Sequence, residues 1–260
     1  MVEIKNLCFS YQKNVPIFAD FGWHVAQGEA WSIVGPSGCG KTTLLYLLAG
    51  LYPPSSGTII IGGMPLDKPR LSTGLVLQDY GLLPWATAID NISVGLRIRG
   101  VERKEATRVA REWLTRLALD SVAGHYPAQL SGGQRQRVAI ARTLALQPDL
   151  LLMDEPLASL DAMTREDLQT LIIELRDVLP ATAMVLVTHD IEEAVYLGKK
   201  ILVLDNPPNT HPVIMENPDS GCAEYRRTPD YAFKCGEVRE LFRQQAKKCG
   251  VKTMKVGLGK

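Results

Sequence analysis

The sequence predicts an α/β fold with a largely parallel sheet, and three observations point to it. Residues 150–153, LLLM, form a short apolar run, which is typical of a strand buried on both faces of a parallel sheet. Predicted strands and helices alternate from residue 150 to residue 205. A glycine-rich loop at residues 35–43 follows one predicted strand and opens a helix.

The first part of the chain supplies strands and one helix. Residues 2–11, 22–25 and 29–34 alternate like short strands, and the last of them leads into the glycine-rich loop. The pattern becomes helical from Thr42 to Gly50, and PPSSG at residues 53–57 predicts a turn. Further strands are predicted at residues 58–63 and 74–78.

The middle of the chain is helical. Residues 88–119 have helical periodicity, clearest at 113–119, and helical signals resume over residues 132–146. We interpret about residues 85–140 as a helical insertion within one domain of residues 1–205. The rest of that domain predicts strands at 150–153, 183–190 and 200–205, and helices at 164–179 and from residue 192.

Residues 206–260 are predicted to form a peripheral C-terminal tail. Turn-forming residues dominate NPPNTHP and ENPDSG, and the last stretch is interpreted as a short basic helix. We expect residues 252–260 to be mobile.

Composition excludes several classes of protein. Lysine and arginine number 29 against 28 acidic residues, which gives no sign of binding to nucleic acid or to an anionic membrane. No run approaches the roughly 20 apolar residues of a membrane-spanning helix, and the N-terminus lacks the order of a signal peptide. We therefore expect a cytosolic protein that reaches a membrane only through a partner. The five cysteines are widely spaced without a CxxC pair, so we expect free thiols and no zinc site.

The first loop, GPSGCGKTT, has the form of a P-loop, which binds a nucleoside triphosphate. Its glycines let backbone N–H groups turn toward the β-phosphate, and the following helix directs its positive dipole end at the anion. Lys41 is expected to reach the β- and γ-phosphates, and Thr42 to place its hydroxyl on Mg²⁺. The residues expected to bind ATP here are Gly35, Pro36, Ser37, Gly38, Cys39, Gly40, Lys41, Thr42 and Thr43.

Two acidic residues follow the LLLM run. Asp154 ends a predicted parallel strand, where a carboxylate can hold Mg²⁺ through a water molecule. On the same strand Glu155 would face the opposite way, toward the γ-phosphate, where it can polarise the attacking water. The alternative is a solvated acidic turn, which the apolar run before the pair disfavours.

A second glycine pair stands in LSGGQ at residues 130–134, and this loop has no lysine. Ser131, Gly132, Gly133 and Gln134 open a predicted helix, whose N-terminus can bind an anion. Ser131 can also act simply as the helix cap, and the two roles are compatible. Because such a loop supplies only one wall of a nucleotide site, we expect another copy's P-loop to supply the other wall in a two-fold dimer.

Together, the P-loop, LSGGQ and LLLMDEP resemble the nucleotide-binding subunit of ABC transporters over about residues 1–205. The resemblance implies a P-loop NTPase (RecA-like) core with a mainly parallel sheet, an N-terminal antiparallel β-subdomain and an inserted α-helical signature subdomain. It also implies an ATPase that uses ATP and Mg²⁺.

The resemblance assigns four further residues. Tyr11 matches the aromatic residue that stacks on adenine, and Gln78 matches the Q-loop glutamine that touches Mg²⁺ or the attacking water. Asp161 matches the D-loop aspartate at the dimer seam, and His189 matches the switch histidine that contacts the γ-phosphate. Each residue also has an ordinary structural interpretation, but their order and spacing favour these roles. The catalytic residues are then Glu155, His189 and Gln78, and the Mg²⁺ residues are Thr42, Gln78 and Asp154.

Three more stretches, LPWATAIDNISVGL, DEPLASLDAMTR and VTHDIEEAVYL, are similar to the ATPases of nitrate, sulfonate and taurine importers. That group commonly has phenylalanine and glycine where this chain has Leu157 and Ala158, and often methionine in place of Gln134. The similarity implies that ATP closes a dimer of this chain with itself or with a homologous ATPase. It places that dimer at the cytoplasmic face of the cell membrane.

The similarity also implies partners. These are transmembrane permease subunits and, indirectly, an extracytoplasmic solute-binding protein, with no nucleic acid. Segment 78–91 is expected to touch the permease through Leu83 and Trp85, and burial of these side chains in the core is the alternative.

Two other functions and one reactive residue complete the expectations. A soluble ABC-type ATPase that acts on nucleic acid in translation or repair would usually carry a coiled-coil insert or two fused cassettes, which this sequence lacks. A non-catalytic regulatory partner is disfavoured by the intact Glu155 and His189. Cys39 lies at a predicted helix N-terminus, which favours the thiolate, so we expect alkylation to inhibit ATP hydrolysis and ATP to protect. An inert thiol crowded by backbone is the alternative.

Overall fold

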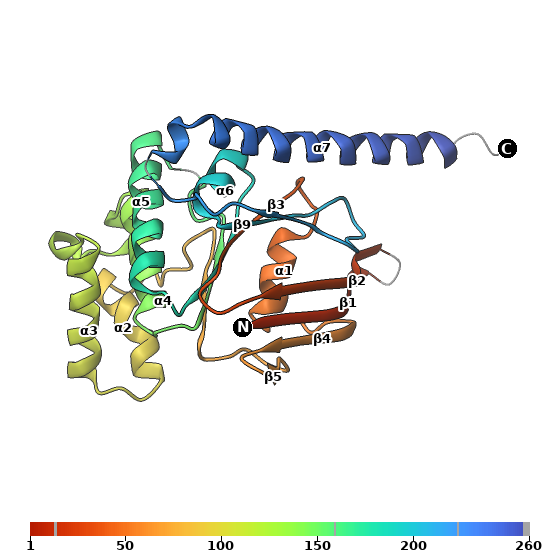
Figure 1. The fold of residues 1–260 in the computed structure, drawn as a ribbon. Coiled ribbons are helices and arrows are strands. Elements are labelled where there is room, and N and C mark those ends of the chain that lie inside the picture. Colours follow the sequence, from red (N-terminus) through yellow and green to blue (C-terminus); the bar gives the residue numbers. More distant parts are fainter. Residues whose placement is uncertain (13–14, 159, 223, 257–260) are drawn as a thin grey trace. The chain divides into compact units, whose positions relative to one another are not determined.

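The computed structural model describes residues 1–12, 15–158, 160–222 and 224–256 (Figure 1). The chain divides into two compact units, one formed by Met1–Pro69 with Ala183–Lys260 and the other by Arg70–Thr182. Residues 257–260, part of the stretch expected to be mobile, lie outside the described residues. The predicted boundaries at residues 205 and 206 stay a prediction.

The first unit contains an antiparallel sheet of four strands. β1 (Val2–Gln12), β2 (Val15–Val25), β4 (Ser56–Ile61) and β5 (Met64–Pro65) lie in the order β2-β1-β4-β5. Hydrophobic side chains of β1 alternate into the core, and Asn6 breaks the alternation with a φ of 50° where the register shifts. This sheet is the predicted N-terminal antiparallel β-subdomain.

The same unit contains the strands that carry the P-loop. β3 (Ala30–Val34) pairs in parallel with β8 (Ala183–Val187) and β9 (Lys200–Val203), and β10 (Val213–Glu216) is antiparallel to β9. Every residue of β3 and β8 is buried, as expected of strands covered on both faces. α1 (Lys41–Leu48) follows β3, and α6 (Ile191–Leu197) follows β8. β10 was not predicted, because turn-forming residues flank its four residues.

The second unit contains the helices of the predicted insertion and two parallel strands, β6 (Thr73–Val76) and β7 (Leu150–Asp154). Its helices are α2 (Ala88–Ile98), α3 (Arg103–Arg116), α4 (Gly132–Leu144) and α5 (Ala162–Val178), with single turns η1 (Asp120–Val122) and η2 (Pro127–Gln129). Gly74 lets α4 approach β6, since a Cβ there would lie 2.4 Å from the methyl group of Thr143. The predicted α/β fold class, with its mainly parallel sheet and its helical subdomain, is confirmed.

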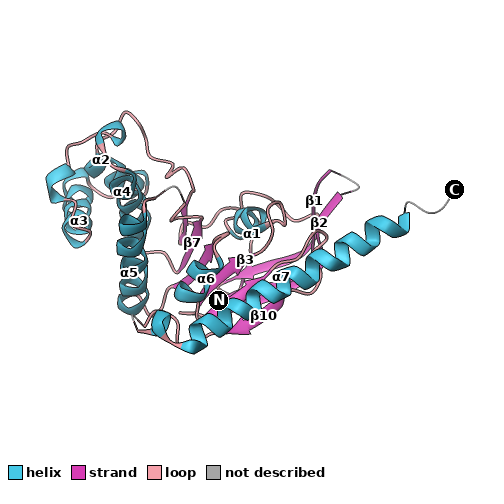
Figure 2. Ribbon diagram, turned by 90° about the horizontal axis from the view of Figure 1, so that it is seen from above, coloured by secondary structure: helices cyan, strands magenta, loops and turns pink. Residues whose placement is uncertain are grey.

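The tail differs from the expected short helix. After the turn η3 (Tyr225–Arg227), α7 (Pro229–Val256) is 28 residues long, and its first half packs against α6 (Figure 2). Cys235 and Val238 of α7 are buried with Ala194 and Val195 of α6. The helix therefore begins well before its lysine-rich end, because apolar residues at helical spacing pack against α6. Among the described residues, no helix is both long and apolar enough to cross a membrane.

Candidate functional site

The P-loop lies between β3 and α1, as predicted. Gly38 and Gly40 have φ values of 77° and 107°, in the left-handed region that glycine adopts without strain. Gly40 precedes the helix, and no side chain caps α1 at that position. The first backbone N–H groups of α1 and its positive dipole end therefore face the loop, which is the arrangement that binds phosphate.

The outer wall of the P-loop is tightly packed. A Cβ on Gly35 would lie 2.6 Å from Cys39 Sγ and 2.9 Å from the carbonyl oxygen of Leu204. A Cβ on Gly40 would lie 2.5 Å from Cγ2 of Ile17. The loop is thus closely packed, and a side chain at Gly35 or Gly40 would collide with Cys39, Leu204 or Ile17.

Lys41 is held across the P-loop. Its Nζ donates hydrogen bonds to the carbonyl oxygens of Gly35 at 2.9 Å and Pro36 at 3.1 Å, and the residue is only 8% exposed. Burial fixes the long side chain in one arrangement, with its ammonium group on the same carbonyls that shape the loop. A cation so placed can bind phosphate oxygens with little loss of conformational freedom.

Asn209 also holds the P-loop and was not predicted. It is 3% exposed, its Nδ2 donates to the carbonyl of Cys39 at 2.8 Å, and its Oδ1 accepts from the N–H of Asp205 at 2.8 Å. Its backbone N–H donates to the carbonyl of Ile17 at 2.9 Å. The sequence gives one weak signal for this residue, which is an asparagine after two prolines in a turn-rich stretch. That stretch belongs to the predicted tail, so no role in the site was expected for it.

Tyr11, the predicted adenine platform, is the last residue but one of β1. Its ring is 58% exposed and lies edge-on to the rings of Phe9 and Tyr52, with centroids 5.1 and 5.7 Å away. Its hydroxyl is 3.0 Å from Oγ1 of Thr43. An exposed aromatic face fixed to the P-loop fits the predicted stacking on a base.

The expectation that Cys39 favours the thiolate is wrong, whereas inhibition by alkylation and protection by ATP stay predictions. The residue is 1% exposed, and this burial raises the pKa of its thiol, because the surrounding groups solvate a thiolate poorly. Lys41 acts in the opposite direction but does not overcome the burial. The alternative that the sequence left open, an inert thiol, describes Cys39 better. The other cysteines with described side chains, Cys8, Cys222 and Cys235, are free thiols, as expected.

His189 follows β8 and precedes α6. Thr188 before it is buried, and its N–H donates to the carbonyl of Ile33 at 3.1 Å. Asp190 after it caps α6, accepting from the N–H groups of Glu192 at 2.8 Å and Glu193 at 3.2 Å. The exposed His189 side chain therefore projects between two anchored neighbours.

In the second unit, Asp154 and Glu155 have different backbones. Asp154 is the last residue of β7 and is 3% exposed. Glu155 lies beyond the strand with a φ of 45°, so the alternation argument that placed it opposite Asp154 is wrong. The left-handed turn determines the direction of its side chain instead. Oε2 of Glu155 accepts a hydrogen bond from Nε2 of Gln78 at 3.3 Å. The structure thus brings together two of the three predicted catalytic residues.

The LSGGQ loop is a capped helix start, as the structural alternative expected. Ser131 Oγ accepts from the N–H of Gln134 at 3.2 Å, and Gln134 Oε1 accepts from the N–H of Ser131 at 2.9 Å. This reciprocal pair is a capping box. A Cβ on Gly133 would lie 2.4 Å from Cγ2 of Thr164, so Gly133 is needed for close approach to α5.

Asp161 caps α5 beside this contact. Its carboxylate accepts from the N–H of Thr164 at 3.0 Å and from Oγ1 of Thr164 at 2.7 Å. The bond from the Thr164 N–H is the main cause that lowers the pKa of the Asp161 carboxyl. Thr164 therefore joins two predicted sites, since its hydroxyl holds Asp161 and its methyl group touches Gly133.

The segment predicted to touch a permease is stiffened by Asn91, which was not predicted. Asn91 is fully buried in α2, and its Oδ1 accepts from the N–H of Leu83 at 2.8 Å. Its Nδ2 lies within donating distance of three carbonyl oxygens, those of Leu83 at 3.1 Å, Ala86 at 2.9 Å and Thr87 at 3.1 Å. Trp85, inside this loop, is 75% exposed, which excludes core burial for its side chain. Leu83 is half-buried.

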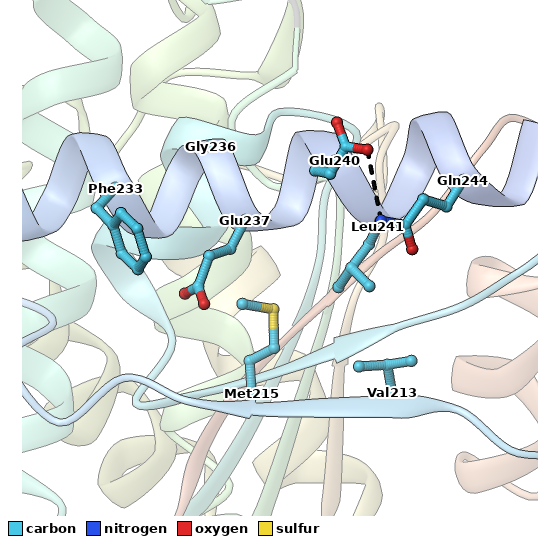
Figure 3. A pocket seen from close by; sticks show the side chains of 8 residues that line it. All are labelled: Val213, Met215, Phe233, Gly236, Glu237, Glu240, Leu241 and Gln244. Atoms are coloured by element: carbon cyan, nitrogen blue, oxygen red, sulfur yellow. Dashed lines mark hydrogen bonds between the residues drawn. The ribbon is translucent and has the colours of Figure 1, made fainter.

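A separate groove of about 590 Å³ lies between α7 and β10 (Figure 3). It is mostly apolar, its lining residues include two glutamates, and it includes none of the predicted site residues. Its lining residues are Val213, Met215, Phe233, Gly236, Glu237, Glu240, Leu241 and Gln244.

The donors of the predicted site suit Mg²⁺ bound with a phosphate. The three residues predicted to hold it offer a hydroxyl, an amide and one carboxylate. Among the described residues, no group of three or more His, Cys, Asp or Glu side chains could hold a metal ion. Mg²⁺ typically takes one or two protein ligands and completes its shell with phosphate oxygens and water.

The sequence and fold are similar to those of known proteins. The ABC transporter family matches residues 18–158. The taurine import ATP-binding protein TauB of Pseudomonas aeruginosa is 45% identical over 192 residues, which cover 74% of this chain and 73% of the relative. TauB of Escherichia coli K12 is 42% identical over 208 residues, covering 80% and 81% of the two chains.

Solved structures agree. The dimeric ATP-binding cassette MJ0796, in a post-hydrolysis state with ADP and Pi, matches with a TM-score of 0.73 and 31% identity. The match covers 83% of this chain and 98% of MJ0796. CbiO1 from Clostridium perfringens, part of the ABC transporter complex CbiONQ, also has a TM-score of 0.73, with 27% identity, and the match covers 84% of this chain and 88% of CbiO1.

Proposed function

Because the chain belongs to the ABC transporter family, as one of its ATP-binding proteins, we propose that it powers uptake of taurine or a related sulfonate. The chain binds ATP and is an ATPase coupled to import. The observation that supports the solute class is the identity of 45% to a taurine import protein over three quarters of the chain. This subunit would not meet the solute, which would cross a separate membrane permease.

Binding of the phosphates and of adenine falls to the first unit in this proposal. The backbone N–H groups at the start of α1 and the ammonium of Lys41 hold the phosphates, and the exposed ring of Tyr11 stacks on adenine. Thr42, Asp154 and Gln78 are the residues that would hold Mg²⁺. When bound, Mg²⁺ neutralises charge on the phosphate oxygens during transfer to water.

Hydrolysis falls to Glu155, Gln78 and His189. Glu155 accepts a proton from, and orients, the water that attacks the γ-phosphate, and the bond from Gln78 fixes the carboxylate at the end of β7. His189 donates a hydrogen bond to the γ-phosphate. Glu155 directly follows β7 and Gln78 lies two residues beyond β6, so two paired parallel strands set the backbone positions of both residues.

We propose that two copies work together. The capped start of α4, with Ser131, Gly132, Gly133 and Gln134, is one wall of a phosphate site and has no lysine. The dimeric form of the similar cassette MJ0796 supports pairing of this chain with itself or with a homologous ATPase. Asp161, at the cap of α5, would lie at the seam between the copies.

Coupling to transport would use the loop held by Asn91. The exposed Trp85 is available for a cytoplasmic helix of the permease, and the amide of Asn91 makes the loop stiff enough to transmit closure of the dimer. The chain would thus be attached to the cytoplasmic face of the cell membrane through the permease. An extracytoplasmic solute-binding protein would deliver the solute from the other side.

Reconstitution tests this function. The chain, its permease and its solute-binding protein are placed in proteoliposomes loaded with ATP, and uptake of radiolabelled taurine is measured. We expect uptake with the parent chain and none with Glu155→Gln, which should still bind ATP and dimerise. ATP hydrolysis that responds to nucleic acid but not to the permease would instead support the soluble ABC-type ATPase.

A further inference from the structure

The helix α6 is too short to set its own position. It has seven residues, Ile191–Leu197, and isolated helices shorter than about 12 residues are marginal in water. Its first residue follows His189 by two positions, so the position of α6 constrains the backbone of His189. That placement must come from contacts with other elements.

The tail grips the first turn of α6. The hydroxyl of Tyr231 donates a hydrogen bond to the carbonyl oxygen of Glu192 at 3.0 Å. Nη2 of Arg239 lies 2.8 Å from Oε1 of the same Glu192. Tyr231 and Arg239 both lie on α7, eight positions apart, and therefore reach one neighbour from the same helical face. Glu192 is three residues from His189.

The tail also holds the other end of α6. Nδ2 of the buried Asn217 donates to the carbonyl oxygens of Val195 at 2.6 Å and Gly198 at 2.7 Å. The hydroxyl of Tyr225 in turn donates to Oδ1 of Asn217 at 2.5 Å. These bonds satisfy carbonyl groups at the end of a helix that lack helical partners.

A third contact lies in the middle of the helix. The guanidinium carbon of Arg226 is 3.6 Å from the centroid of the Tyr196 ring, a cation–π contact. Beneath it, Cys235 and Val238 of α7 pack with Ala194 and Val195. Side chains of Asn217, Arg226, Tyr231 and Arg239 thus contact α6 at its start, middle and end. On the other side, the N–H of Thr188 bonds to Ile33 of β3, and Val34, Ile201 and Val203 pack in the same cluster as Ala194 and Val195.

We infer that Tyr231 and Arg239 are positioning residues that act through Glu192 to set His189 for hydrolysis. This rests on the proposed role of His189 at the γ-phosphate. The tail then affects catalysis, because its contacts with Glu192 fix the C-terminal side of the segment that carries His189.

The test uses the full chain with its permease and the variants Tyr231→Phe and Arg239→Gln. Tyr231→Phe keeps the size of the ring, and Arg239→Gln shortens an exposed side chain, so the core below should stay packed. We expect kcat for ATP to fall roughly threefold to tenfold, since misplacing a group by 1 Å can cost about 100-fold, while KM changes less than about twofold. Arg243→Gln, one turn further along α7 in an exposed pair with Glu240, is the matched control and should change neither.

A double-mutant cycle separates positioning from general destabilisation. In a His189→Ala background, measured by single turnover, Tyr231→Phe should cause no further loss, because the group it positions is gone. Losses that multiply would overturn the inference while leaving His189 in its proposed role. Full activity of His189→Ala would contradict both the role and the inference.

A spectroscopic measurement gives a readout independent of turnover. The chain has four histidines, so labelling histidine with ¹⁵N gives few signals, and His189→Ala assigns the one of interest. We expect Tyr231→Phe and Arg239→Gln to shift the His189 ring signals, and Arg243→Gln to leave them in place. Unchanged His189 signals in both α7 variants would overturn the inference whatever their activity.

Discussion

The two glycine loops of this chain are built on different principles. In the P-loop, Gly38 and Gly40 have φ values of 77° and 107°, and the loop curls around a buried lysine. In LSGGQ, neither glycine has a positive φ, and the backbone is an ordinary helix start closed by a capping box. The first loop is a cradle that can surround an anion, and the second is a flat helix end.

The glycines also serve different purposes. Gly38 supplies a backbone conformation, and no atom lies near a Cβ placed on it. Gly133 supplies space, because Thr164 lies where its side chain would be. A similar run of letters therefore gives one loop complete in itself and one that needs a second surface, which is the physical reason to expect a working pair.

The largest expected effect concerns the cradle. Lys41→Ala should weaken ATP binding at least roughly 100-fold, since charge-assisted hydrogen bonds contribute about 1.5–3 kcal/mol each and Lys41 would make two. Calorimetric titration with a non-hydrolysable ATP analogue measures the loss. Ser131→Ala is the control for the other loop and should bind the analogue as the parent chain does. Equal loss in both variants would contradict the division of roles.

The second prediction concerns the flat helix end. In the Glu155→Gln background, Ser131→Ala should weaken ATP-dependent dimerisation about tenfold, because it removes a donor to the partner's phosphate. It should also lower the free energy of unfolding by about 1 kcal/mol through loss of the cap. Sedimentation with ATP measures the first effect and urea denaturation the second. A dimer as stable as that of the parent would place Ser131 outside the interface.

The third prediction separates the two signature glycines. Gly133→Ala should lower the free energy of unfolding by about 1–3 kcal/mol through overpacking against Thr164. Gly132→Ala should change it little, because the nearest atom, 3.2 Å away, is the flexible end of Leu160. Adding Thr164→Ser removes the methyl group, keeps the bond to Asp161, and should restore most of the stability of Gly133→Ala. Failure of this rescue would show that the Gly133–Thr164 contact is not the cause.

The smallest effect concerns Cys39. With its thiol pKa raised by burial, Cys39 should react with iodoacetamide roughly tenfold or more slowly than the exposed Cys222 at pH 7.5, and its rate should still rise above pH 9. Peptide mapping by mass spectrometry follows each site separately. Labelling of Cys222 should leave ATP hydrolysis unchanged. Fast labelling of Cys39 at neutral pH would restore the original expectation of a thiolate.

The fold was predictable where a periodic pattern extends over enough residues. The apolar runs of β7 and β8 and the helical patterns of α3 and α5 are local signals, and the structure has these elements. β10 was missed because its four residues are ordered by pairing with β9, a partner that no local pattern shows. The length of α7 was not predicted, because its first half is stabilised by packing against α6, which no local pattern shows.

The candidate site was predictable in its residues and less so in its geometry. Short motifs named Lys41, Asp154 and Glu155, but the left-handed turn at Glu155 cannot be read from a strand pattern. Asn91 and Asn209 were missed because their amides bond to main-chain atoms of other segments, and such bonds leave no motif. Cys39 was misjudged because the helix start was visible in the sequence and the burial was not.

The bonds made by Asn209 have a practical consequence for any shortened form of this protein. A chain cut after Asp205 would retain every recognisable motif, yet it would lose the amide that ties the backbone of Cys39 to the neighbouring strand. It would also lack Asn217, whose amide donates hydrogen bonds to the carbonyl groups at the end of α6. A minimal fragment chosen by motif alone would therefore contain every ATPase motif but would lack two sets of hydrogen bonds that hold the P-loop and α6 in place.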